Sequence, residues 1–502
     1  MATLNLGVEN LHVSHEYSMR PRVSATVQAI QLDDLAKSSP APRGGARGYN
    51  PARDLPPELL TEIFDMCSPP GEDGFDGLLD STTPEQEVER LAKKYLLQLS
   101  QVCSRWYGIV MCTPMLWSIL IVDTVLWPSA TPSTSVLMGL VSSSLERSCS
   151  HPLRIQVAAD EPDGRRVLEL LSLHAGRWRH FHLWTQLPSF QGLHAAKGNI
   201  PLLETLEISI QNEDWTVTEL DNVFEVAPSL YEVTFTGLAG KVQSLPWDQL
   251  SDFKYINIVP NDLVDSLSLL RRFSSYTKCT LELATFDTAP IVDLPPIVSD
   301  VSELALSFAV EFDEVQPTDV LSPVLECLTF PSLDSLGLVG ENGEPPLSWS
   351  QDQFLAFASR SGLHVTLTTL EIRATIRDYE LLRCLAALPQ LEYLTLSDSQ
   401  DGAHACISDT LFTALIQRPD QTCHAPHLSF LCVTSLLQFT ESVFWNFVHS
   451  RPASTYRDGF PLEVHIYWLP GRTRELTEEF LAHGLELVER GELTFSAGLD
   501  LE

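Results

Sequence analysis

The sequence predicts an α/β protein in which a small N-terminal helical module precedes a long array of strand–helix repeats that form a curved parallel sheet. Three observations lead to this fold class. Apolar residues recur at helical spacing between residues 55 and 117. From residue 150 onward, a short strand pattern followed by a helical stretch returns repeatedly. The 502 residues are 44% apolar and 20% charged, which is typical of a globular chain.

The chain is strongly acidic, and its charge restricts the partners that it can bind. It has 66 acidic and 32 basic residues, which give a formal net charge of −34. Since nucleic acids and anionic membranes are bound largely through Lys and Arg, we expect neither as a partner. The sequence shows no secretory signal pattern and no long apolar run. The scattered cysteines, without a CxxC pair, suit reduced thiols, so we expect a cytoplasmic or nuclear protein.

Composition divides the chain into segments of different character. Residues 1–50 end in KSSPAPRGGARGYNP and are expected to be a disordered tail, because they can bury little apolar surface. An acidic insert at 68–90 is rich in Pro and Gly, which predicts a solvated loop. Around these, we expect the helical module over 51–125, a linker with a helix over 126–150, the repeat array over 151–490 and a C-terminal tail over 491–502.

The helical module contains more apolar surface than one packed face needs. Its first helix begins at Pro56 and Pro57, because proline fits a first turn, where a missing N–H is not needed. The segment LLQLSQVCSRWYGIVMCTPMLW continues the helical pattern until Thr113 and Pro114 interrupt it. Two adjoining apolar stripes mark the first helix, namely Leu59, Ile63 and Met66 beside Leu60, Phe64 and Cys67. One of these stripes is available for a docking surface.

A single strand pattern, apolar-x-x-apolar-x-apolar, recurs through the repeat array. Most copies are 23 to 27 residues apart, and toward the C-terminus some are 32 to 37 residues apart. Each copy predicts one strand of a parallel sheet, followed by a helix on its back. The copies begin at Trp178, Leu203, Leu230, Phe253, Val301, Leu333, Leu367, Leu391 and Leu428, with a weaker copy at Lys278.

Residues 53 to about 121 resemble the F-box, a three-helix module that docks on the adaptor subunit of SCF-type cullin-RING ubiquitin ligases. The matching elements are Leu55-Pro56, Glu62-Ile63-Phe64, Val102-Cys103-x-x-Trp106 and Pro114-x-Leu116-Trp117. The acidic insert departs from the usual F-box. The array is similar to irregular leucine-rich repeats, although Asn follows the strand only at Asn261. Large fungal sets of F-box proteins resemble this combination.

The resemblance implies an adaptor contact on the first helix and around the two tryptophans. A three-helix element of this size cannot bury both apolar stripes, which favours docking over a purely internal core. Internal packing stays open as the alternative, and for Trp106 and Trp117 it is equally well supported. The expected adaptor-binding residues are Leu55, Pro56, Leu59, Leu60, Ile63, Val102, Trp106, Leu116 and Trp117.

The residues between the last two apolar positions of each strand are expected to project from the open concave face of the sheet. We expect target-binding residues at Glu207, Thr234, Asn257, Glu282, Glu371 and Thr395, with Ala305 and Gly337 at equivalent positions and Glu204, Glu303, Asp334 and Glu392 on the rim. This acidic face predicts a basic or hydrogen-bond-rich protein target that dissociates as salt rises. The alternative is a solvated face without a ligand.

We expect no catalytic residues, no cofactor and no metal. The phosphate-binding, dinucleotide-binding, zinc-protease and serine-hydrolase motifs are absent. The cluster of His404, Cys406, Cys423, His424 and His427 has zinc-ligand chemistry, but Pro426 interrupts it and indicates a surface loop. The sequence therefore predicts a non-catalytic substrate-recognition subunit that binds the adaptor, through it a cullin, and an unknown protein substrate. An interaction scaffold that presents no substrate is the alternative.

Overall fold

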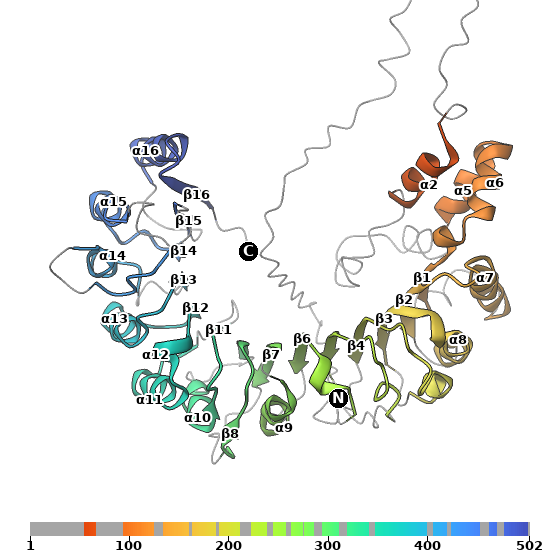
Figure 1. Cartoon of the computed structure of the whole chain (residues 1–502), viewed down its shortest axis with the longest axis horizontal. Coiled ribbons are helices and arrows are strands. Elements are labelled where there is room, and N and C mark those ends of the chain that lie inside the picture. Colours follow the sequence, from red (N-terminus) through yellow and green to blue (C-terminus); the bar gives the residue numbers. More distant parts are fainter. Residues whose placement is uncertain are drawn as a thin grey trace, which may run out of the picture. The chain divides into compact units, whose positions relative to one another are not determined.

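The computed structural model (Figure 1) describes residues 55–66, 94–124, 134–159, 163–186, 190–210, 222–237, 244–257, 263–274, 276–285, 294–310, 319–340, 347–398, 405–418, 423–451, 461–468 and 476–499. The expected tail at 1–50 and the acidic insert at 68–90 lie outside these residues. The chain divides into two compact units, Met1–Leu153 and Arg154–Glu502. Each unit is described by itself.

The first unit is built mainly from short helices. Its elements are α2 (Pro57–Met66), α5 (Lys94–Val102), α6 (Ser104–Cys112), the 3-10 helix η1 (Pro114–Trp117), β1 (Ile119–Asp123) and α7 (Thr134–Arg147). The α6 helix begins where the Cys103 side chain accepts a hydrogen bond from the Trp106 amide, 3.5 Å away. It ends before Pro114, which lacks an amide hydrogen and starts η1.

The core of the first unit holds one stripe of α2 against α5, α6 and η1. Leu60 and Phe64 of α2 are 2% and 0% exposed. The ring of Phe64 meets the edge of Trp106, with 4.8 Å between ring centroids. Trp117 is buried, and its indole nitrogen donates a hydrogen bond to the Val110 carbonyl at 2.8 Å. Leu96, Val110 and Leu116 complete this cluster.

The second unit is dominated by a large parallel sheet, to which 13 strands from β2 onward belong in the described part of the chain. Neighbouring strands from β3 onward pair in parallel. From the start of this unit the order is β2 (Leu153–Ala159), β3 (Trp178–Thr185), β4 (Thr205–Ile210), β5 (Glu232–Thr236), β6 (Asp252–Asn257), β7 (Lys278–Thr285), β9 (Glu303–Val310), β11 (Ser335–Gly340), β12 (Thr369–Arg373), β13 (Tyr393–Ser397), β14 (Phe430–Ser435), β15 (Leu462–Trp468) and β16 (Leu493–Leu499). A separate two-stranded parallel sheet pairs β8 (Ile297–Val298) with β10 (Leu328–Thr329).

Among the described residues, helices cover one face of this sheet and leave the other face open (Figure 1). The α-helices are α8 (Asp163–Ser172), α9 (Leu263–Ser268), α10 (Leu321–Cys327), α11 (Gln351–Ser361), α12 (Leu363–Thr366), α13 (Asp378–Ala387), α14 (Asp409–Leu415), α15 (Glu441–His449) and α16 (Glu478–Glu489). Shorter 3-10 helices are η3 (Ala175–Arg177), η4 (Gln191–Ala196), η5 (Trp247–Gln249) and η6 (Leu269–Arg272). The strands lie on the inner side of the curve, so the uncovered face is concave.

Side-chain alternation along each strand explains which face is covered. In β4 and β14, partly exposed and buried residues alternate without interruption. The buried positions are apolar, such as Leu206 and Ile208 in β4 and Leu431 and Val433 in β14. They face the helices, and the polar positions between them face the concave side. The predicted α/β class with a curved parallel sheet is confirmed.

The sequence pattern finds the central strands but not those at the C-terminal end. Residues 491–502, expected to be a tail, contain β16, which pairs with β15 along its whole length. In β14, the first apolar residue of the pattern is Leu428, three residues before the buried Leu431. In β15, the equivalent position, three residues before the buried Val464, is Pro461. In β16 the equivalent position is Glu492. Because the first apolar residue is missing in both copies, the six-residue pattern does not identify them.

Candidate protein-interaction surfaces

The α2 helix exposes an apolar stripe that adjoins its buried stripe. Leu59, Ile63 and Met66 are 44%, 38% and 79% exposed, and their spacing of four and three residues aligns them along one side of the helix. We call these three residues the α2 stripe. Pro56, directly before the helix, is also exposed. Apolar side chains in such a row are typical of a surface that binds a partner.

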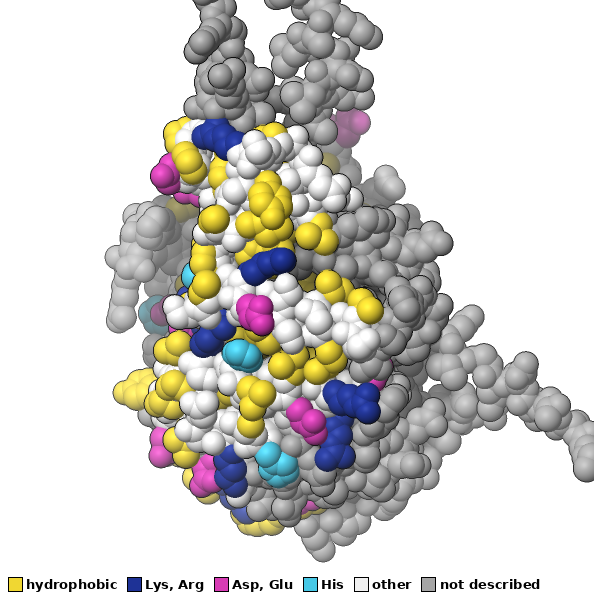
Figure 2. Space-filling model, turned by 90° about the vertical axis from the view of Figure 1, so that its right-hand side faces the viewer, with side chains coloured by type: hydrophobic (Ala, Val, Ile, Leu, Met, Phe, Trp, Pro, Cys, Tyr) yellow, Lys and Arg dark blue, Asp and Glu magenta, His cyan; other side chains and the backbone are white. Residues whose placement is uncertain are grey.

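Other apolar residues of the first unit are exposed on α5 and α6. Val102 is 57% exposed at the end of α5, and Tyr107 on α6 is 53% exposed. Figure 2 views the molecule from the side on which Figure 1 draws these two helices, and hydrophobic side chains gather in its upper part. The first unit therefore presents apolar surface beyond α2.

The structure separates the predicted adaptor-binding residues into exposed and internal ones. Pro56, Leu59, Ile63 and Val102 are exposed. Leu55 and Trp106 are partly buried and pack on the core, while Leu60, Leu116 and Trp117 belong to it. Trp117 is only 3% exposed and lies beneath the Arg147 guanidinium, 4.5 Å from its ring centroid. A contact role for Leu60, Leu116 and Trp117 does not fit this placement, because their surface is already covered.

The register of the second unit aligns open-face residues into rows that cross the strands. The central row follows the expected position between the two buried residues of each strand. It runs through His182, Glu207, Thr234, Lys254, Thr280, Ala305, Gly337, Glu371, Thr395, Cys432, His465 and Ser496. Of the expected target-binding residues, Glu207, Thr234, Glu371 and Thr395 lie in this row.

Two expected face residues lie in other rows, because the strand pattern was placed wrongly in β6 and β7. Asn257 pairs in register with Leu283, which is buried, so its position belongs to a core-facing row. Glu282 does lie between buried residues, but one row beyond the central one, beside Ile256. In β7 the pattern matches Leu281 and Leu283, whereas in β6 the cause is Ile256, an apolar residue on the open face. This residue allows the apolar pattern to be read in a second frame. The second frame starts three residues after the correct one, which starts at Leu250.

The carboxylates of the open face are engaged with basic or histidine side chains. Lys254 Nζ lies 2.8 Å from Glu282, and Arg373 Nε lies 3.2 Å from Glu371 Oε1. Burial raises the pKa of Glu371 to about 7. His182 contacts Glu207 at 3.1 Å, but burial lowers the pKa of His182 to about 4, so the imidazole is neutral at pH 7. Much of the acidic character of this face is therefore compensated locally.

The four expected rim residues lie at the starts of the strands. Glu303 is the first residue of β9, and the other three directly precede β4, β11 and β13. The backbone carbonyls of Glu204, Asp334 and Glu392 each accept two amide hydrogen bonds from the neighbouring strand. These positions therefore begin the hydrogen-bond ladder, whatever their side chains bind.

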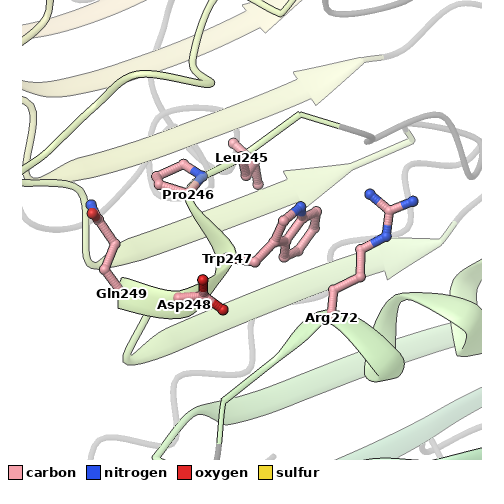
Figure 3. A pocket seen from close by; sticks show the side chains of 6 residues that line it. All are labelled: Leu245, Pro246, Trp247, Asp248, Gln249 and Arg272. Carbon is pink, nitrogen blue, oxygen red and sulfur yellow. The ribbon is translucent and has the colours of Figure 1, made fainter.

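A hollow of about 510 Å³ lies where η5 approaches η6 (Figure 3). Trp247 forms its wall and packs on Phe273, with 5.3 Å between ring centroids. The Arg272 guanidinium lies 5.4 Å from the centroid of the Trp247 ring. Gln249 donates hydrogen bonds to two backbone carbonyls. These side chains support the chain segment leading into β6, and the hollow is not on the rows of the open face.

The histidine and cysteine cluster weighed for zinc is spread out. Cys406 is buried, Cys423 and His424 are partly buried, and His427 is exposed, while His404 lies outside the described residues. Where the structure describes the chain, no three His, Cys, Asp or Glu residues gather as a metal site would require. Among the described helices, none has both the length and the apolar character needed to cross a membrane.

Comparison with known families identifies one region of the chain. Residues 52–123 match the F-box-like family. The match covers α2, α5, α6, η1 and β1, and therefore includes the α2 stripe. An F-box-like domain implies, in general, binding to the adaptor subunit of an SCF-type ubiquitin ligase. The comparison with curated proteins found no match.

Proposed function

We propose that this protein is the substrate-recognition subunit of an SCF-type cullin-RING ubiquitin ligase. The F-box-like region binds the adaptor, and through it the cullin, while the strand–helix array acts as an irregular leucine-rich-repeat solenoid that selects a protein target. Other subunits perform the ubiquitin transfer, so this chain needs no catalytic residue or cofactor of its own. The single observation that carries the proposal is the exposed α2 stripe inside the F-box-like region.

We infer a narrower adaptor contact than the sequence predicts. Leu59 and Ile63 form its centre, with Met66 extending the row, since these side chains are exposed on one side of α2. Pro56 and Val102 are exposed and lie at its periphery. Leu60, Leu116 and Trp117 support the contact from within the core, and Leu55 and Trp106 pack between core and surface.

The target contact is proposed for the open face of the sheet. Its central row provides Glu207, Thr234, Glu371 and Thr395 as polar side chains directed away from the helices. Such a concave row of polar residues can bind an extended protein segment. We place the solenoid over residues 151–490 together with β16, and the complex in the cytoplasm or nucleus.

The test of the adaptor contact is the double substitution Leu59→Glu and Ile63→Glu. Both positions are exposed in the free protein, so the first unit should fold, but two carboxylates would become unpaired charges in the complex. We expect binding to purified adaptor–cullin complex to weaken at least about 100-fold, because each buried unpaired charge costs several kcal/mol. Surface plasmon resonance gives the affinity, and circular dichroism verifies folding.

A matched control is Val365→Glu on α12, which introduces the same charge at an apolar residue that is 65% exposed in the second unit. This variant should bind the adaptor normally. Equal binding by the double variant and the wild type would exclude the proposed docking surface. If adaptor binding is lost as expected but no cellular protein accumulates, the chain is a scaffold and presents no substrate for ubiquitination.

A further inference from the structure

The C-terminal part of the open face differs from the rest in its chemistry. Across β12, β13, β14 and β15, one row contains Thr369, Tyr393, Phe430 and Glu463, and the next contains Glu371, Thr395, Cys432 and His465. Aromatic side chains thus lie on adjacent strands between two carboxylates. We call Glu371, Tyr393, Phe430, Glu463 and His465 the aromatic patch.

The rings of the aromatic patch form a continuous platform on the open face. The centroids of Tyr393 and Phe430 are 5.9 Å apart, and those of Phe430 and His465 are 5.3 Å apart. Tyr393 is 42% exposed and Phe430 is half-buried, so this platform is open to a partner. The rings of Phe412, Phe444 and Phe447, in contrast, are buried under the sheet. An exposed aromatic ring on a strand stabilises a fold less than a buried ring does. Its exposed face can bind a cation.

The His465 ring is fixed in place by hydrogen bonds on both nitrogens. Its Nε2 lies 2.8 Å from Glu463 Oε1, and its Nδ1 contacts the Ser496 hydroxyl. The ring therefore needs no further movement to take part in the platform, and Glu463 is held at its edge. Glu463 keeps a side-chain exposure of 44%, so the carboxylate stays accessible beside the rings.

At the other end of the platform, the Glu371 side chain keeps an exposure of 24% and lies beside Gly337 of β11. Its Oε1 contacts Arg373, whereas a Cβ atom at Gly337 would lie 3.9 Å from its Oε2. Gly337 and Ala305 provide almost no side-chain cover on the β11 and β9 side. Burial raises the pKa of Glu371 to about 7, so its ionised form is poorly stabilised even though Arg373 contacts it. A further cation beside Oε2 would correct this.

We propose that the aromatic patch binds an extended basic segment of the target protein, which crosses over Tyr393 and Phe430 with one lysine or arginine side chain beside Glu371 and another beside Glu463. This inference rests on the proposed function for the identity of the partner as a target. The patch spans four strands, a width of about 14 Å, which an extended segment crosses with about four residues. Carboxylates and ring faces both favour a cation, and the net charge of −34 disfavours an anionic ligand such as nucleic acid.

The experiment measures binding of a labelled peptide made of repeated Gly-Ser-Arg units, with a citrulline peptide of the same length as the uncharged control. Full-length protein is titrated at physiological salt, and fluorescence anisotropy gives the affinity. We expect the Arg peptide to bind at least about tenfold more tightly than the citrulline peptide, because the charge-assisted contacts are lost with citrulline. Equal affinities would overturn the proposal.

Variants distinguish the aromatic patch from general attraction to an acidic protein. The pair Glu371→Gln and Glu463→Gln should weaken Arg-peptide binding about tenfold, and Tyr393→Leu about threefold, because the ring face is lost while apolar area is kept. Glu232→Gln, in the Tyr393 row but on β5, is the matched control and should change little. An equal loss in the control, or no loss in the carboxylate pair, would overturn the proposal.

The same titration separates this inference from the proposed function. The variant Leu59→Glu/Ile63→Glu should bind the Arg peptide like the wild type, since the α2 stripe is not part of the patch. If the adaptor binds and the Arg peptide does not, only the aromatic patch is wrong. If the Arg peptide binds and the adaptor does not, the ligase assignment is wrong while the cation-binding surface stands.

Discussion

The α2 helix and the strands of the second unit expose opposite kinds of side chain, although both bury apolar residues behind them. On α2, the residues that face away from the core are apolar, with Leu59 and Ile63 beside the buried Leu60 and Phe64. On β4 or β13, the outward residues are Glu207 or Thr395, between buried leucines and isoleucines. The difference teaches that α2 exposes apolar residues of the kind that a partner covers, whereas the sheet exposes polar residues that water can solvate.

The largest expected effect tests the two sides of α2 against each other. Phe64→Ala removes a fully buried ring and should lower the free energy of unfolding of the first unit by about 3–5 kcal/mol. Ile63→Ala, one residue earlier, should change it by less than about 1 kcal/mol. Hydrogen exchange of the α6 amides, followed by mass spectrometry, reports both. Similar losses in the two variants would mean that the α2 stripe is not free surface.

A second, smaller effect concerns Glu371 on the open face, because its carboxyl group is partly removed from solvent. Burial raises its pKa from 4.5 in the unfolded chain to about 7 in the folded protein. The folded state therefore keeps a proton that the unfolded state has lost, and stability falls as pH rises from about 5 to above 7. Glu371→Gln removes this dependence.

We expect Glu371→Gln to raise the free energy of unfolding at about pH 8 by up to about 3 kcal/mol, with Arg373 reducing the gain through its contact with the carboxylate. Near pH 4 the variant and the wild type should be equally stable. Urea unfolding at a series of pH values measures the difference. A gain that is the same at pH 4 and pH 8 would show that packing of the amide, and not the charge, is responsible.

The smallest expected effect tests whether the open face is truly tolerant. Ile256→Thr replaces an apolar residue on this face and should change the free energy of unfolding by no more than about 0.5 kcal/mol. Tyr255→Ser, the neighbouring core position, is the contrasting variant and should cost about 3 kcal/mol or more. Thermal unfolding measures both. A large loss in Ile256→Thr would mean that this face is covered by another part of the protein.

Sequence reasoning identifies a strand wherever the apolar pattern fits the chain in a single frame, even where Tyr393 or Phe430 lies on the open face. The copies from Leu203 to Leu230 and from Leu333 to Leu428 coincide with strands, because leucine at the buried positions leaves a single frame. In β6, Ile256 on the open face permits a second frame, which moves the expected face residue to Asn257. At the C-terminal end, Pro461 and Glu492 remove the first apolar residue, and two strands go unnoticed.

The candidate site was predictable by region but not by side chain. Leu59 and Leu60 are chemically identical, and periodicity cannot tell which stripe of α2 faces α6, because that depends on packing with residues 96–117 that no local pattern contains. The aromatic patch could not be predicted from the sequence for the same reason. Tyr393, Phe430 and His465 lie in three separate copies of the repeat, and neighbouring members of this set are 35 or more residues apart in the sequence. Only the strand register places their rings together.

The parallel ladder has a consequence for how the second unit comes apart. From β3 to β16 each strand is hydrogen-bonded only to its immediate neighbours within the described residues, so β16 can detach without disturbing β4. Free energy in such an array is a sum of local terms, and the chain can lose its end copies first. Heat or denaturant would then remove strands from the ends of the array first, so the effect of a substitution depends on how far its strand lies from those ends.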